Sequence, residues 1–481
     1  MSFTREFPLL GAAALATLVR TGEVSPVDVT RAAFDAIDRL EPQLHAFATQ
    51  AQETAIAAAA DIEHRIARNE PVGALAGVPV AVKDLVMTKD LRTTFGSRLY
   101  ADFVPDHDDI VVERLKAADA IVIGKTNVSE FGFGAVGHNP LFPTTRNPWD
   151  LERTPGGSSA GSASAVAAGI CPLAIGSDGG GSVRVPASFT GIVGFKASMG
   201  RVPLWPGCRD ERFPGASGWE SIEHIGPMAR SVEDAALLLD VISGPDPRDR
   251  LSIPADRRSW RDRAHQDPRP GLRIAYCPAW ADLPVDPEVR AIVDAAVAVL
   301  EGRLGHQVEL APSPFGDLIE TFRSLVALET DITGLRAMAR GRECDLGGPV
   351  RDLIARSYAG DVFCDAVTAR KAAVNAMARF MAKFDLLVTP TVPVLPFPID
   401  WEGPGIIAGV AVADDAWTPF SYPANLTGQP ALNVPAGWTA TGLPVGLQIM
   451  GRHLGDDAVL ELAASFERAC PWSDRRPACR A

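Results

Sequence analysis

Lysine is scarce in this sequence of 481 residues, and its scarcity makes each lysine informative. Arginine keeps its charge in proteins, whereas a buried lysine can lose its proton near neutral pH. A lysine kept in an apolar setting therefore indicates a role that arginine cannot fill. Seven lysines stand against 39 arginines: Lys83, Lys89, Lys116, Lys125, Lys196, Lys371 and Lys383.

Long hydrophobic runs are also missing. No run of about 20 apolar residues exists, so we expect no membrane span and no membrane partner. The formal net charge of −13 does not fit a nucleic-acid partner, which needs a basic surface. Residues 8–19 have the apolar character of a signal-peptide core, but the run is short and contains Thr17. We favour an amphipathic helix closed by Gly22, with Leu10, Leu15 and Leu18 inward, and keep a signal-like segment as the alternative.

Cysteine and histidine lack the spacing of disulfide frameworks or metal sites. The seven cysteines, Cys208 among them, are scattered without a CxxC pair, which indicates free thiols and a reducing, cytoplasmic location. The eight histidines lie far apart without an HExxH motif, so we expect no metal. The segment IVIGKT (121–126) ends like a phosphate-binding loop but has Asp119 where that loop needs glycine, so we expect no cofactor.

Apolar segments typical of strands alternate with helical patterns along the chain. This alternation predicts an α/β fold with a central mixed β-sheet covered by helices on both faces. We expect a single large domain, residues 1–481. Its predicted parts are N-terminal helices (1–70), a core (about 75–245), a connector (244–270), a helical excursion (about 312–383) and a C-terminal return to the core (384–470).

Residues 154–196 are dominated by small residues, and two serines there follow glycine runs. Ser158 follows Gly156-Gly157, and Ser182 follows three glycines. Glycines let several backbone N–H groups approach one point, as acyl transfer requires. The stretch GSSAG (157–161) matches the GxSxG elbow with Ser159 as nucleophile, but polar residues precede it where that motif needs a buried strand.

A serine nucleophile needs a base, and no histidine here has the setting of a catalytic triad. A neutral buried amine can serve instead. Lys83, Lys125 and Lys196 each follow an apolar segment, and the residues alone do not choose among them.

The segment GGSSAGSASAVAAG…GSDGGGSVRVPASFTGIVGFK (156–196) resembles the signature of the amidase signature family. Four more stretches agree: GVPVAVKD, GKTNVSEF, TRNPWDLERTPGGSS and NLTGQPALNVPAG…GLPVGLQIMG, together spanning about residues 75 to 450. The resemblance implies the amidase signature fold and a Ser–cis-Ser–Lys triad. In that triad Lys83 is the base, Ser158 the bridging serine with a cis bond to Gly157, and Ser182 the nucleophile. We expect an oxyanion hole at Gly179, Gly180, Gly181 and the Ser182 N–H, with support from Ser159, Asp178 and Arg184.

The family resemblance implies hydrolysis of a small-molecule amide through an acyl-Ser182 intermediate. Apolar and aromatic residues near the expected site favour an apolar or aryl group on the substrate. The same triad allows a carbamate or an ester as alternative substrates. The candidate binding residues are Phe131, Phe133, Gly134, Trp205 and Trp417, with Phe213, Trp219 and Phe420 also considered.

Two further functions stay open. One is the glutaminase subunit of a tRNA-dependent amidotransferase. The sequence departs from the pattern of that protein at GAVGHNPLF (134–142), where a Ser-Ser-Thr-Glu-Asn stretch is expected, and in a longer loop over residues 199–220. The other is a non-catalytic scaffold, which the intact Lys83, Ser158 and Ser182 disfavour. A homodimer is the default expectation for such an enzyme.

Overall fold

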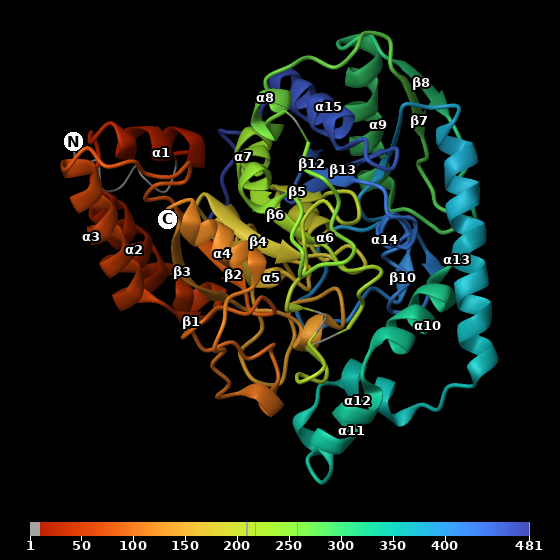
Figure 1. The fold of residues 1–481 in the computed structure, drawn as a ribbon. Helices are drawn as coiled ribbons and strands as arrows, with labels where there is room; N and C mark the ends of the chain where they lie inside the picture. The colour runs from red at the N-terminus through yellow and green to blue at the C-terminus, as the bar shows by residue number, and fades with distance from the viewer. Residues whose placement is uncertain (1–9, 208–209, 217, 257, 481) are drawn as a thin grey trace.

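A central mixed β-sheet organises the chain in the computed structural model, which describes residues 10–207, 210–216, 218–256 and 258–480. The eleven strands of this sheet follow the order β1-β3-β2-β4-β6-β5-β12-β13-β9-β7-β8 (Figure 1). Their bounds are β1 (Phe47–Gln50), β2 (Pro79–Lys83), β3 (Ile121–Thr126), β4 (Leu173–Ser177), β5 (Val193–Lys196), β6 (Ile225–Ala229), β7 (Arg273–Tyr276), β8 (Gln307–Leu310), β9 (Leu386–Pro390), β12 (Ala431–Trp438) and β13 (Pro444–Gly451). The two short strands β10 (Ile406–Ile407) and β11 (Val410–Ala411) form a separate hairpin.

Both faces of the sheet are covered, as β2 illustrates. Successive side chains of a strand point to opposite faces. Val80 and Val82 belong to one apolar core with helices α4, α7, α9 and α15, whereas Ala81 belongs to a second core with α2, α3 and α5. The expected α/β architecture with a helix-covered mixed sheet is therefore confirmed. The helices of these layers are α1 (Ala12–Arg20), α2 (Pro26–Leu44), α3 (Gln52–Ala67), α4 (Ile110–Ala117), α5 (Ala160–Ala167), α6 (Arg184–Thr190), α7 (Val232–Ile242), α8 (Trp260–Ala264), α9 (Pro287–Gly302) and α15 (Asp456–Ala469).

The predicted helical excursion forms four helices between β8 and β9. They are α10 (Ile319–Glu329), α11 (Ile332–Ala339), α12 (Gly348–Ala355) and α13 (Gly360–Met381). Helices α11 and α12 lie at the bottom of the view in Figure 1, and α13 runs along its right edge. The chain then returns to the sheet through β9, and the short helix α14 (Pro423–Thr427) precedes the β12–β13 hairpin.

The first described segment is helical. Helix α1 buries Leu15, and Gly22 follows it with a φ of 73°, so the predicted amphipathic helix lies where expected, while residues 8 and 9 lie outside the described residues. No helix in the described part of the chain is long and apolar enough to cross a membrane. The cysteines that the structure describes are all free thiols, and Cys208 lies outside them.

Candidate active site

Two adjacent parallel strands place the first two groups of the site. Strands β2 and β4 pair in parallel, with Val82 opposite Ile175, so their carboxyl ends meet at one edge of the sheet. Strand β2 ends at Lys83 and β4 ends at Ser177. The glycine-rich loop that carries the candidate nucleophile begins directly after Ser177. The sheet thus delivers a lysine and the serine loop to the same point.

Lys83 is completely buried and contacts the candidate bridging serine. Its Nζ donates to Ser158 Oγ at 2.7 Å, to Ser177 Oγ at 2.9 Å and to the Ser177 carbonyl oxygen at 3.1 Å. The peptide bond between Gly157 and Ser158 is cis. Burial lowers the pKa of Lys83 to about 8, against the opposing charges of Glu223 and Asp178. A substantial fraction of this lysine is therefore neutral near pH 8, as a general base must be.

Geometry separates Lys83 from the other two candidate lysines. Burial also lowers the pKa of Lys125 to about 8 and that of Lys196 to about 7, so pKa alone does not distinguish them. Lys125 bonds the Val86 carbonyl and Thr88 Oγ1, and Lys196 lies against His224 Nε2 at 3.2 Å. Of the three, Lys83 is the lysine that reaches a serine of the signature segment.

Ser182 stands on the wall of a cavity, next to the other two serines. Its carbonyl oxygen accepts from the Ser159 N–H at 3.3 Å. The side chain of Ser159 is occupied elsewhere, because its Oγ donates to the Ser177 carbonyl at 3.2 Å and accepts from the Ser177 N–H at 3.3 Å. In the described structure the hydroxyls of Ser158 and Ser182 are not hydrogen-bonded to each other.

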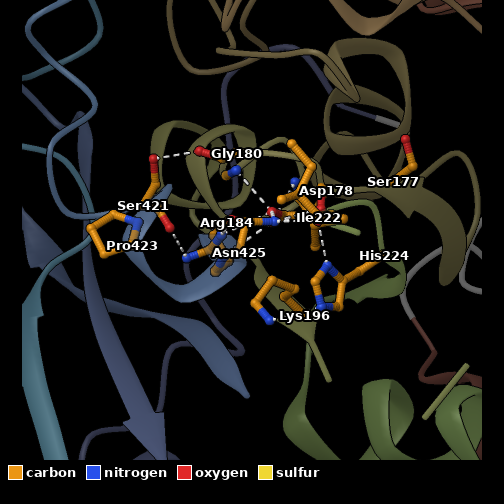
Figure 2. Close-up of polar contacts among 12 residues, drawn as sticks. Ser177, Asp178, Gly180, Arg184, Lys196, Ile222, His224, Ser421, Pro423 and Asn425 are labelled. Carbon is orange, nitrogen blue, oxygen red and sulfur yellow. Dashed lines mark hydrogen bonds and ion pairs between the residues drawn. The ribbon is translucent and has the colours of Figure 1, made fainter. Parts of the chain in front are cut away.

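A buried ion pair holds the loop that presents Ser182 (Figure 2). Arg184 Nη2 donates to Asp178 Oδ1 at 2.8 Å and its Nε donates to Oδ2 at 3.0 Å, with both side chains fully buried. Burial raises the pKa of Asp178, but the Arg184 guanidinium outweighs it and holds that pKa well below its usual range. Asp178 also accepts from the Gly181 and Val183 N–H groups, and so fixes the loop on both sides of Ser182.

The C-terminal part of the chain completes this support, which the sequence alone did not reveal. Asn425 Nδ2 donates to the Asp178 carbonyl at 2.7 Å, and Arg184 donates to Asn425 Oδ1 at 2.7 Å. Ser421 Oγ donates to the Gly180 carbonyl at 2.7 Å (Figure 2). The motif that begins NLTGQP therefore positions the signature loop, although more than 200 residues separate them in the chain.

The glycines of the loop differ in what their backbone N–H groups can do. The Gly181 N–H donates to Asp178 Oδ1 at 2.8 Å and is already engaged. No hydrogen bond of the described residues uses the N–H groups of Gly179, Gly180 or Ser182. Gly181 has a φ of 126°, and a Cβ there would lie 2.5 Å from Ser421 Cβ, so a larger residue does not fit.

The cavity beside Ser182 has a volume of about 420 Å³. Its apolar lining comes from four parts of the chain: Phe133 before the signature segment, Trp219 in the long loop, side chains of α10 and α12, and Trp417. The charged lining residues are largely exposed and form a rim, where Arg323 pairs with Asp415. Among the described residues, no group of His, Cys, Asp or Glu is arranged to hold a metal ion. The lining residues that sequence analysis missed include Ile319, Phe322, Arg323, Val326, Leu353 and Tyr358.

The candidate binding residues divide into two groups. Phe133, Gly134, Trp219 and Trp417 line the cavity. The other four lie outside its lining and pack against side chains elsewhere in the protein. The ring centroid of Phe131 lies 5.8 Å from that of Tyr100, and the ring centroid of Phe213 lies 5.0 Å from that of Phe103. The Trp205 ring lies under the Arg248 guanidinium, 4.7 Å from Cζ to the ring centroid. Phe420 is buried near Trp280.

Comparison with known proteins gives the family of the chain. Residues 28–460 match the model of the Amidase family. The chain is 36% identical to an acylamidase of Rhodococcus erythropolis over 98% of this chain and 97% of that protein. It is also 36% identical to a subunit of the glutamyl-tRNA(Gln) amidotransferase of a Cyanothece species, over 95% and 97% of the two chains. The crystal structure of a bacterial aryl acylamidase of the amidase signature family superposes with a TM-score of 0.89, at 30% identity and 97% coverage of both chains. The chain belongs to the amidase signature family, whose enzymes hydrolyse amide C–N bonds.

Proposed function

We propose that this enzyme is a stand-alone amidase that hydrolyses a carboxamide with an apolar or aryl group through an acyl-Ser182 intermediate. The observation that carries the proposal is the cavity beside Ser182, which is lined by the aromatic side chains of Phe133, Trp219, Phe322 and Trp417 and by aliphatic side chains of α10 and α12. An apolar group that fills such a cavity gains about 0.8 kcal/mol for each buried methylene.

The proposed reaction begins with neutral Lys83, which takes a proton from Ser158 as Ser158 takes one from Ser182. The Ser182 oxygen attacks the amide carbonyl, and the N–H groups of Gly179, Gly180 and Ser182 stabilise the oxyanion. The relay then returns the proton to the leaving nitrogen, the amine departs, and water hydrolyses the acyl-enzyme. Ser159, Asp178 and Arg184 support this loop through the contacts described above.

Overall sequence identity does not distinguish a stand-alone amidase from an amidotransferase subunit, since the acylamidase and the amidotransferase subunit are each 36% identical to this chain. The cavity favours the amidase, because its apolar lining suits a hydrophobic group better than the polar side chain and charged backbone of free glutamine.

A substrate panel tests this function. Anilides, aliphatic primary amides, carbamates, esters and glutamine are compared by kcat/KM. We expect the anilides of apolar acids to exceed glutamine, and each added acyl methylene to raise kcat/KM up to about fourfold until the cavity is filled. The variant Phe322→Ala is expected to weaken this preference, because Phe322 lines the cavity.

Phe213→Ala is the matched control, since Phe213 is also half-buried but lies outside the cavity lining. It is expected to keep the wild-type preference. If glutamine is preferred over every anilide, the result contradicts the proposal and favours the amidotransferase function. If carbamates or esters are preferred, the result contradicts the assignment to amides but keeps Ser182 as nucleophile.

A further inference from the structure

Glu223 is a buried carboxylate beside the proposed oxyanion loop. It lies two residues before β6 and is 9% exposed. A Cβ built on Gly179 would lie 2.6 Å from Glu223 Oε2 and 2.7 Å from Trp219 Cε3. The carboxylate therefore packs directly against the backbone of that loop, on the side where Trp219 also covers it.

The Ser177 hydroxyl contacts Lys83 and lies near Glu223. Ser177 Oγ accepts a hydrogen bond from Lys83 Nζ at 2.9 Å, which leaves its own proton available for another acceptor. Ser177 and Glu223 line the same small cavity, so the Ser177 hydroxyl lies near the carboxylate. Hydrogen bonds join Ser158, Lys83 and Ser177, and Glu223 lies across this small cavity from the last of them.

The surroundings leave Glu223 few other interactions. Its Oε2 has no hydrogen-bond partner within the described residues. Of the nearby charged groups, Asp178 is paired with Arg184, and the His224 ring bonds the Ile222 carbonyl and Lys196. Asp109 shares a small cavity of about 40 Å³ with Glu223. A buried carboxylate is costly unless a charge or hydrogen bonds compensate it. Burial raises the pKa of the Glu223 carboxyl to about 7, and the charge of Lys83 is the main influence that opposes this rise.

We propose that Glu223 is a positioning residue that acts on Lys83 through Ser177, and this proposal rests on the proposed function. It holds Ser177 so that Lys83 points at Ser158, and it stabilises the ammonium that forms when Lys83 accepts the serine proton. That proton leaves again through Ser158 to the leaving nitrogen, so the carboxylate neither gains nor loses a proton in the cycle.

A pH profile distinguishes this role from a merely structural one. Burial lowers the pKa of Lys83 to about 8, and the charges of Glu223 and Asp178 oppose that shift. Because the base must be neutral, kcat/KM of the wild type rises as the pH rises through about 8. Glu223→Gln removes one of the two opposing charges, so the pKa of Lys83 falls and the acid limb moves to lower pH, by about one unit or more. The plateau rate falls as well, since the lysine becomes a weaker base.

Two further variants complete the experiment. Glu223→Asp keeps the charge and is expected to restore much of the wild-type profile. Glu467→Gln is the matched control, because burial raises the pKa of Glu467 on α15 to about 7, as it does for Glu223. Glu467 accepts from the Val232 N–H away from the site. It is expected to leave the acid limb unchanged.

An acid limb that stays in place in Glu223→Gln, or that moves equally in Glu467→Gln, overturns the inference. If Glu223→Gln does not fold, Ser177→Ala breaks the same connection and is expected to shift the limb in the same direction. An acid limb that stays in place in Ser177→Ala also overturns the inference. Failure of the proposed function is distinguishable, because it is seen in the wild type as an absence of amide hydrolysis or of an acyl group on Ser182.

Discussion

Ser182→Ala is expected to lower kcat for amide hydrolysis by about four to six orders of magnitude, since it removes the proposed nucleophile. No neighbouring serine is placed to replace it. Ser158 Oγ is bonded to Lys83, and Ser159 Oγ is bonded to the Ser177 backbone. Steady-state rates on the best substrate of the panel measure the loss. Thermal unfolding should change little, because no hydrogen bond of the described structure uses the Ser182 hydroxyl.

Ser164→Ala is the matched control for Ser182→Ala. Ser164 is a buried serine of α5 whose hydroxyl donates to the Arg146 carbonyl at 2.9 Å, outside the cavity lining. It should keep the wild-type kcat while losing about 1 kcal/mol of stability. Near-normal turnover by Ser182→Ala would show that another group attacks the carbonyl.

Lys83→Met is expected to lower kcat/KM by about two to four orders of magnitude, the usual contribution of a general base. Methionine has a similar length and stays apolar in a fully buried position, but it cannot accept the Ser158 proton. The loss should persist at pH values above and below the Lys83 pKa of about 8. By contrast, a variant in which only the pKa of the base had shifted would recover its kcat/KM at one end of the pH range.

Lys125→Met supplies the comparison, because Lys125 is equally buried and has a pKa lowered by burial to about 8. Its contacts are to Thr88 and the Val86 carbonyl, so its removal should reduce stability and not the rate of folded enzyme. Unfolding curves measured alongside the rates separate the two effects. If Lys125→Met lost the rate and Lys83→Met kept it, the assignment of the base would be wrong.

Continuous apolar runs made much of the fold predictable. The apolar run before Lys83 forms β2, and the small and apolar residues that follow Ser159 form α5. Strand β6 was not predictable, because Gly226 and Pro227 lie inside it and both residues usually weaken a strand. Its pairing with β4, where Pro227 lies opposite Ile175, is a tertiary effect that the local sequence does not express.

The site was predictable where its residues belong to contiguous motifs. Ser158, Ser182 and the glycines between them share one segment, and family resemblance added Lys83. Asn425 and Glu223 were missed, because long-range folding alone brings them to that segment. The position of Ser177 was accessible from the sequence. Ser177 is the last residue of β4 and Lys83 is the last residue of β2, so parallel pairing of the two strands places Ser177 and Lys83 together.

Phe322 and its neighbours on α10 were missed for another reason. The sequence predicts helices over the excursion but not their direction over the sheet. A Cβ on Gly180 would lie 2.5 Å from Phe322 Cζ, a contact across more than 100 residues that sets one wall of the cavity. Such a contact depends on how a whole helical layer docks, and no local pattern encodes it.

The most direct measurement is the site of covalent attachment in the wild-type enzyme. The enzyme is incubated with a serine-reactive aryl phosphonate, digested and mapped by mass spectrometry. A second sample is incubated with a slowly hydrolysed anilide, quenched rapidly, and digested and mapped in the same way. The account predicts a single adduct on the peptide that contains Ser182, in both cases, and none in Ser182→Ala. An adduct on Ser158 or Ser159, or rapid hydrolysis with no adduct at all, would contradict it.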